Sequence, residues 1–167
     1  MRDILVVFVQ ILLLVIFQVF ILNNIQLFGY IVPMVYVWGI MMLPFKTPKW
    51  LVLIVSFVLG FIIDIFSPSV GINAAVCVIT GFLRPIILNM VIDNIDNTQY
   101  YRPTQLSLGF KKFFMYAAVT VVIHTALYFM LEVMSFKDVF QTLLRILLSS
   151  AVTLLIILLS DTVFFRR

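Results

Sequence analysis

The sequence predicts an all-α integral membrane protein with about six transmembrane helices. Of its 167 residues, 64% are hydrophobic and only 11% are charged. A typical soluble domain is about 45–50% apolar and about 25% charged, so lipid is the expected solvent for this chain. Because a helix needs about 20 apolar residues to cross a hydrocarbon core of roughly 30 Å, six spans occupy most of the sequence.

Six apolar runs form the expected single transmembrane domain, and they cover residues 4–22, 25–43, 50–66, 70–92, 113–134 and 139–165. The first run is too long for the apolar core of a signal peptide, so we expect it to be a retained helix. Pro33 predicts a kink in the second run. The polar stretch at residues 93–112 is expected to be a cytoplasmic loop.

The cations between these runs are unevenly distributed and predict the orientation. With six spans, one side of the membrane receives Arg2, Lys46, Lys49, Arg102, Lys111, Lys112, Arg166 and Arg167. The other side receives only Lys137, next to Asp138. The positive-inside rule therefore places both termini in the cytoplasm. A five-span arrangement divides these cations between the two sides and is disfavoured.

Several ionisable residues lie inside the apolar runs, where a charge costs at least about 2.5–3.5 kcal/mol at the helix centre. They are Asp64, Arg84, His124, Glu132, Arg145 and Asp161. Such residues indicate a functional or paired site by default, and opposite charges occur at both membrane levels. The simpler alternatives are that the charges near run ends extend toward headgroups and that the histidine hydrogen-bonds between helices.

Asp64 and Arg84 are the strongest of these candidates. Gly60, one turn before Asp64, and Gly71, after the turn, predict a tight hairpin between the third and fourth runs, because small residues let backbones approach closely in lipid. The alternative is that these residues serve packing alone. Arg84 precedes Pro85, which predicts a kink. We expect Arg84 to bind backbone carbonyls or a lipid phosphate in preference to Asp161, since a mid-span ion pair needs good geometry at both ends.

The sequence contains no pattern typical of an enzyme or of a metal or cofactor site. It has one histidine, His124, and one cysteine, Cys77, and it lacks the motifs of hydrolases, zinc proteases and phosphate-binding loops. The cations are scattered in ones and twos without interleaved aromatics, which argues against nucleic acid. We therefore expect a non-enzymatic membrane protein without cofactor or metal.

The segment from Gly60 to Gly71, GFIIDIFSPSVG, resembles the MreD family of rod-shape-determining proteins. Gly60, Asp64 and Gly71 match the family's pattern, and Arg84 is similar to its basic residue further along the same helix. The resemblance implies a scaffold of cell-wall elongation in the bacterial cytoplasmic (inner) membrane that helps control cell shape. The implied partners are the bitopic protein MreC, the actin-like MreB, the glycosyltransferase RodA and its transpeptidase, besides membrane lipids.

The same resemblance implies a fold similar to the substrate-binding subunit of energy-coupling-factor transporters. A small-solute, vitamin-type uptake subunit is therefore the alternative function. Such subunits commonly dock on their transporter through alanines spaced four apart on the first helix. The first run of this sequence contains neither alanine nor glycine, which counts against the alternative.

Overall fold

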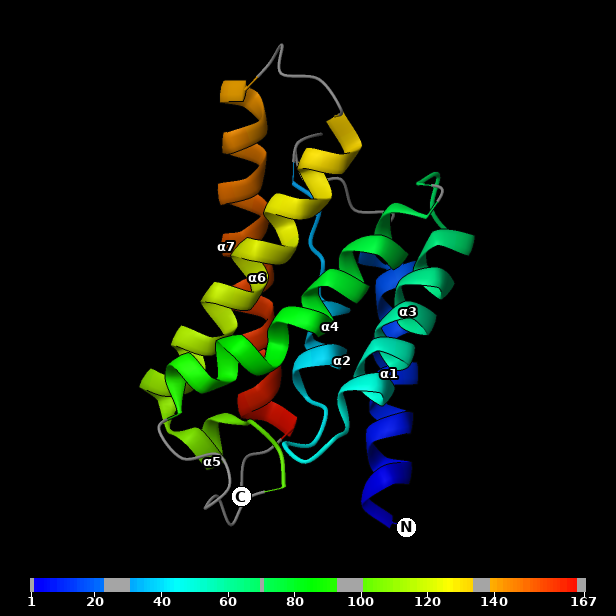
Figure 1. Ribbon diagram of the computed structural model, residues 1–167. Coiled ribbons are helices and arrows are strands. Elements are labelled where there is room, and N and C mark those ends of the chain that lie inside the picture. The colour runs from blue at the N-terminus through cyan, green and yellow to red at the C-terminus, as the bar shows by residue number, and fades with distance from the viewer. Residues whose placement is uncertain (1, 23–30, 70, 93–100, 134–138, 165–167) are drawn as a thin grey trace.

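The computed structural model describes residues 2–22, 31–69, 71–92, 101–133 and 139–164, and for residues 2–8 it describes the backbone alone. These residues form an all-helical structure (Figure 1). The helices are α1 (Arg2–Phe20), α2 (Val37–Met41), α3 (Lys49–Ile65), α4 (Ile72–Val91), α5 (Gln105–Leu108), α6 (Phe110–Val133) and α7 (Val139–Phe164).

Three helices in the described ranges are long and apolar enough to cross a membrane, namely α4, α6 and α7. The helix α3 has 17 residues, and the apolar part found in α1, Val9–Phe20, is shorter still. The predicted all-helical class is confirmed, and the apolar helices suggest a membrane protein. The predicted total of six spans stays a prediction.

The helices α3, α4, α6 and α7 pack side by side in that order, and α2 lies among them (Figure 1). The helix α1 packs beside α3 and α2, away from α7. The beginning of α1, the α2–α3 loop, α5 and the end of α7 lie at one end of the molecule, at the bottom of Figure 1. The α3–α4 turn lies at the opposite end. Lys46, Lys49, Arg102, Lys111 and Lys112 therefore share the lower end.

The second predicted span is not the continuous helix that we expected in its described part. Residues 31–36 are not helical, and the helix α2 contains only five residues. Pro33 explains part of this difference, because proline has no N–H to donate and clashes with a preceding helical turn. Residues 31–34 thus pass through the interior without helical structure, and a turn at Val35 and Tyr36 leads into α2. Residues 25–30 of this predicted span lie outside the described residues.

An extended segment inside an apolar interior needs partners for its backbone polar groups. Side chains from two helices supply them. Gln18 of α1 donates to the Pro33 carbonyl at 2.8 Å and accepts from the Val35 N–H at 3.0 Å. From α7, the Ser149 and Thr153 hydroxyls accept from the N–H groups of Val32 and Met34 at 3.1 and 3.0 Å. The polar residues of these two helices therefore replace the hydrogen bonds that a helix makes internally.

The pattern of buried and exposed side chains on α7 agrees with lipid as the surrounding medium. On α7, Ser149 and Thr153 are fully buried, whereas Leu147 and Leu159 are 67% and 58% exposed. A soluble protein buries its leucines and exposes its serines. This inverted pattern follows when the surrounding medium is as apolar as the core and only polar groups gain by facing inward.

Candidate functional site

Asp64 at the end of α3 caps the first turn of α4. Its Oδ2 accepts a hydrogen bond from the Ala74 N–H at 2.8 Å, and its Oδ1 accepts from the Asn73 N–H at 3.1 Å. The first N–H groups of a helix have no internal partner, and an anion there also interacts favourably with the helix dipole. The half-buried Asp64 carboxylate thus does for α4 what an N-cap side chain normally does, from a neighbouring helix.

Two glycines permit this arrangement. A Cβ atom at Gly60 would lie 2.5 Å from the Asn73 carbonyl oxygen and 2.6 Å from the Ala74 Cα, so only glycine lets α3 approach the α4 backbone this closely. Gly71 begins α4 with φ +78°, a left-handed conformation that favours glycine. The predicted tight hairpin between the third and fourth runs is confirmed, and Gly60, Asp64 and Gly71 form one joint.

The joint continues into a buried hydrogen-bonded network. The Asn73 side chain donates to Asp64 Oδ1 at 2.9 Å and to the Ser69 hydroxyl at 2.7 Å. The Tyr36 hydroxyl lies 2.6 Å from Asn73 Oδ1 and 3.0 Å from Nε2 of His124, whose Nδ1 lies 2.9 Å from the Thr80 hydroxyl. The network therefore links α3, α4, α6 and the extended segment before α2.

The donors of this network can all point toward Asp64. Asn73 uses its N–H₂ group on Asp64, so its oxygen must accept from Tyr36, and the Tyr36 oxygen must then accept from His124 Nε2–H. In a neutral imidazole the Nδ1 atom is then an acceptor, and the Thr80 hydroxyl lies between this atom at 2.9 Å and the Val76 carbonyl, to which it also donates, at 2.8 Å. A charged imidazolium without a carboxylate partner is costly in such a buried place. We therefore assign His124 as the neutral Nε2–H tautomer in a chain of donors that ends on a carboxylate.

Arg84 occupies a second site, nearer the lower end of the molecule. It is 3% exposed, and its Nη2 donates to the Leu43 carbonyl and, at 3.5 Å, to the Pro44 carbonyl. These carbonyls belong to the loop that follows α2, and the buried guanidinium needs acceptors of this kind. Arg84 therefore holds the end of α2 against α4. The helix α4 runs from Ile72 to Val91 without a break at Pro85.

Asp161 does not share the Arg84 site. Its Oδ2 accepts from the Gln105 N–H at 2.8 Å, and the Gln105 side chain donates to the Leu158 carbonyl at 2.9 Å. The possible pairing of Arg84 with Asp161 is thus not the arrangement found. Asp161, fully buried on α7, instead fastens the first residue of α5 to the end of α7.

The remaining candidates lie at the upper end. Glu132 of α6 is exposed, and Arg145 of α7 is close enough to attract it electrostatically. Arg145 is partly buried, and its Nε atom is inaccessible to solvent. An exposed carboxylate such as Glu132 is typical of a helix end near headgroups. Neither residue belongs to the network around Asp64 as described above, so the structure divides the predicted site residues into four separate groups.

Sequence reasoning singled out Asp64 and His124 but not the residues that join them. Tyr36, Asn73 and Thr80 complete the network, and each is an ordinary residue in an apolar run. The available signal was the spacing of Asn73, two residues after Gly71 at the expected beginning of a helix. The position of Tyr36 could not be found this way, because it depends on the extended course of residues 31–36.

The described residues contain no group of three or more His, Cys, Asp and Glu side chains that could hold a metal ion. No family model, curated protein or solved structure matches the chain.

Proposed function

We propose that this chain is a non-enzymatic scaffold of bacterial cell-wall elongation, a multi-pass protein of the MreD type in the cytoplasmic membrane. One observation carries the proposal most strongly. The residues that resemble the family's pattern, Gly60, Asp64 and Gly71, form a single structural joint between α3 and α4. Three matching residues that lie together and act on one helix hairpin support the resemblance better than three matching residues at unrelated places in the fold would.

The chemistry of the network also favours a scaffold. Each polar side chain that joins Asp64 to Thr80 is hydrogen-bonded to its neighbours, and Tyr36, Thr80 and His124 are buried. A fully connected polar network of this kind rigidifies a core and fixes one arrangement of its elements. A membrane subunit that presents fixed surfaces to other membrane proteins needs such an interior.

We further propose six membrane crossings with both termini in the cytoplasm. Besides α4, α6 and α7, the crossings are α1, α3 and the segment that runs through residues 31–36 into α2. The clustering of Lys46, Lys49, Arg102, Lys111 and Lys112 at one end of the molecule supports this orientation. The proposed partners are an MreC-like bitopic protein, RodA with its transpeptidase, and MreB.

A vitamin-type uptake subunit is the second candidate, because a cavity of about 400 Å³ lies between α1 and α7. This volume falls within the range of roughly 300–1,000 Å³ that is typical of small-molecule sites. The cavity lining is mostly apolar, however, and α1 lacks the small residues with which such subunits commonly dock on their transporter.

Affinity purification of the tagged chain from mild detergent distinguishes the two functions. The proposal predicts that a bitopic protein with a periplasmic coiled coil copurifies, together with elongation enzymes. Copurification of a cytoplasmic ATPase and its membrane coupling subunit would instead support the uptake function. A tagged membrane protein of unrelated function, expressed at the same level, controls for carry-over in detergent.

A further inference from the structure

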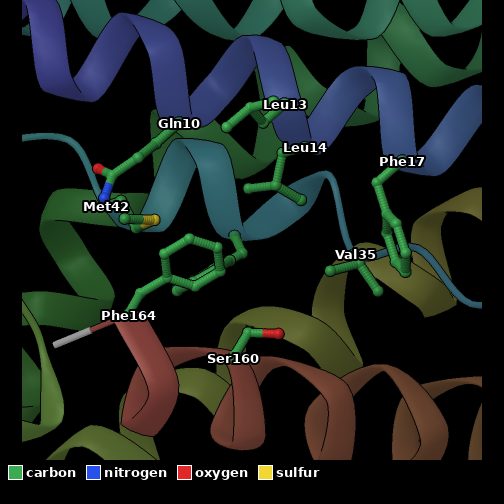
Figure 2. A pocket seen from close by; sticks show the side chains of 9 residues that line it. Gln10, Leu13, Leu14, Phe17, Val35, Met42, Ser160 and Phe164 are labelled. Carbon is green, nitrogen blue, oxygen red and sulfur yellow. The ribbon is translucent and has the colours of Figure 1, made fainter. Parts of the chain in front are cut away.

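The cavity lies between α1 and α7, with the α2 segment between them (Figure 2). Val35, Trp38 and Met42 are buried and form its floor. Leu13 and Phe17 of α1 and Phe164 of α7 line its walls and are 53%, 42% and 58% exposed. The cavity is therefore open to the apolar medium around the helices. From Gln10 to Phe17 it extends along α1 by about 10 Å.

A cation at one end gives this apolar cavity a direction. Gln10 Oε1 accepts a hydrogen bond from the Arg102 guanidinium at 2.7 Å, so a cation lies beside the cavity. At the cavity floor, Trp38 is 3% exposed and stacks at a tilt on Phe164, with 6.0 Å between ring centroids. The Trp38 ring lines the cavity, whereas its Nε1 atom is buried away from the open space.

We propose that this cavity binds one anionic phospholipid of the cytoplasmic leaflet. The phosphate lies near Arg102, and one acyl chain follows Leu13 and Phe17 toward the membrane centre. Basic sites between transmembrane helices on the cytoplasmic side typically bind anionic headgroups. In the proposed orientation, Arg102 lies on this side of the membrane. The inference requires a membrane location for the chain and does not depend on its scaffold role.

The dimensions favour a lipid over a helix of a partner protein. A helix with its side chains is about 10–12 Å across, so it would have to displace α1 or α7 to enter a cavity of about 400 Å³. A single acyl chain enters without such displacement. A polar solute fits poorly, because Gln10 and Ser160 supply the polar side chains among the lining residues, and the Trp38 N–H is buried.

Tryptophan fluorescence tests the proposal directly. The chain has two tryptophans, and Trp50 is 62% exposed at the beginning of α3, so Trp50→Phe leaves Trp38 as the only reporter in the full chain. This variant is reconstituted in phosphatidylcholine vesicles with a small fraction of brominated lipid, whose bromine quenches tryptophan on contact. Brominated phosphatidylglycerol is compared with brominated phosphatidylcholine at the same mole fraction.

We expect brominated phosphatidylglycerol to bind at the site about fivefold more strongly than brominated phosphatidylcholine. This ratio corresponds to the attraction between one cationic side chain and an anionic lipid at the membrane surface. Adding Arg102→Gln should remove this preference, whereas Lys111→Gln, an equal loss of charge on an exposed residue at the same end, should keep it. Ser160→Phe should reduce quenching by either lipid because it fills the cavity. Equal quenching by the two lipids, no quenching by either, or equal losses in the Arg102 and Lys111 variants would overturn the proposal.

Discussion

Asp64 on α3 accepts a hydrogen bond from the backbone N–H of Ala74 on α4, with 2.8 Å between Oδ2 and N. The turn between these residues is short, and Gly60 brings the two helices into backbone contact. The carboxylate thus sits where the helix dipole of α4 and its free N–H groups both favour an anion. Since the same carboxylate also ends the hydrogen-bonded network, this one contact couples the hairpin to the interior.

Asp64→Ala should lower the free energy of unfolding by roughly 1–3 kcal/mol, because it leaves two backbone N–H groups and the Asn73 amide without their acceptor. Asp64→Asn should cost less, since its amide oxygen still accepts one of these bonds. The measurement is thermal or denaturant unfolding of the purified protein in detergent. Glu132→Gln, which neutralises an exposed carboxylate at the same end, is the matched control and should have little effect. Equal costs at the two positions would refute the cap.

Tyr36→Phe tests the hydrogen-bonded network at a residue that the sequence did not predict as part of the site. The change removes one hydroxyl and strands two partners, Asn73 Oδ1 and His124 Nε2, in a buried place. We expect a loss of roughly 1–3 kcal/mol in the free energy of unfolding. Tyr101→Phe, at a tyrosine that is 48% exposed, supplies the control with the same chemical change. If both variants unfold alike, the hydroxyl of Tyr36 contributes nothing.

The tautomer of His124 can be observed without a substitution. Nitrogen-15 spectra of the imidazole should report a proton on Nε2 and none on Nδ1, because the Tyr36 hydroxyl donates to Asn73 and its oxygen then accepts from Nε2–H. In Tyr36→Phe the Nε2 proton loses its acceptor, so its resonance should shift. An Nδ1–H tautomer in the unaltered protein would contradict the assigned direction of the donors.

Arg84 and Asp161 should behave as independent residues. Arg84→Leu removes the bonds to the Leu43 and Pro44 carbonyls, and we expect a cost of roughly 1–3 kcal/mol in the free energy of unfolding. Asp161→Asn still offers an acceptor to the Gln105 N–H and should cost less. In the double variant the two costs should add within about 0.5 kcal/mol, as is usual for residues that do not touch. A large coupling energy between the two substitutions would instead indicate that Arg84 and Asp161 form an ion pair.

The proposed topology makes a separate prediction from chemical labelling. The only cysteine, Cys77, is fully buried and should stay unreactive in the intact protein. A membrane-impermeant maleimide should label Ser67→Cys in intact cells, because the α3–α4 turn faces the periplasm in this topology. The same reagent should label Lys46→Cys only after the membrane is opened. Labelling of Lys46→Cys in intact cells would invert the orientation.

Most helix positions could be read from the sequence, because runs of about 20 apolar residues have one stable form in lipid. The helices α3 and α7 begin and end within a residue of the predicted runs. The prediction of a helix for the second run was wrong at residues 31–36, because an apolar composition fits a buried non-helical segment as well as a helix. What decides its form is distant in sequence, since Gln18, Ser149 and Thr153 supply the hydrogen bonds that a helix would otherwise make.

The candidate site was predictable in part for a related reason. Asp64 stood out because a carboxylate is costly in an apolar run, and Gly60 because small residues permit close packing. The sequence predicted that Arg84 binds backbone carbonyls or a lipid phosphate. It could not predict which carbonyls, because this depends on where α2 ends. Asp161 could not be assigned to α5, because a four-residue helix in a polar stretch leaves no periodic signal.

If this chain supports wall elongation from within the membrane, as we propose, its depletion in the organism that encodes it should change cell shape. Cell length and width are measured by microscopy as the protein disappears, and uptake of labelled vitamins is measured in the same cells. We expect the cells to shorten and round while vitamin uptake is unchanged. Unchanged cell shape together with a loss of uptake would contradict the proposed function.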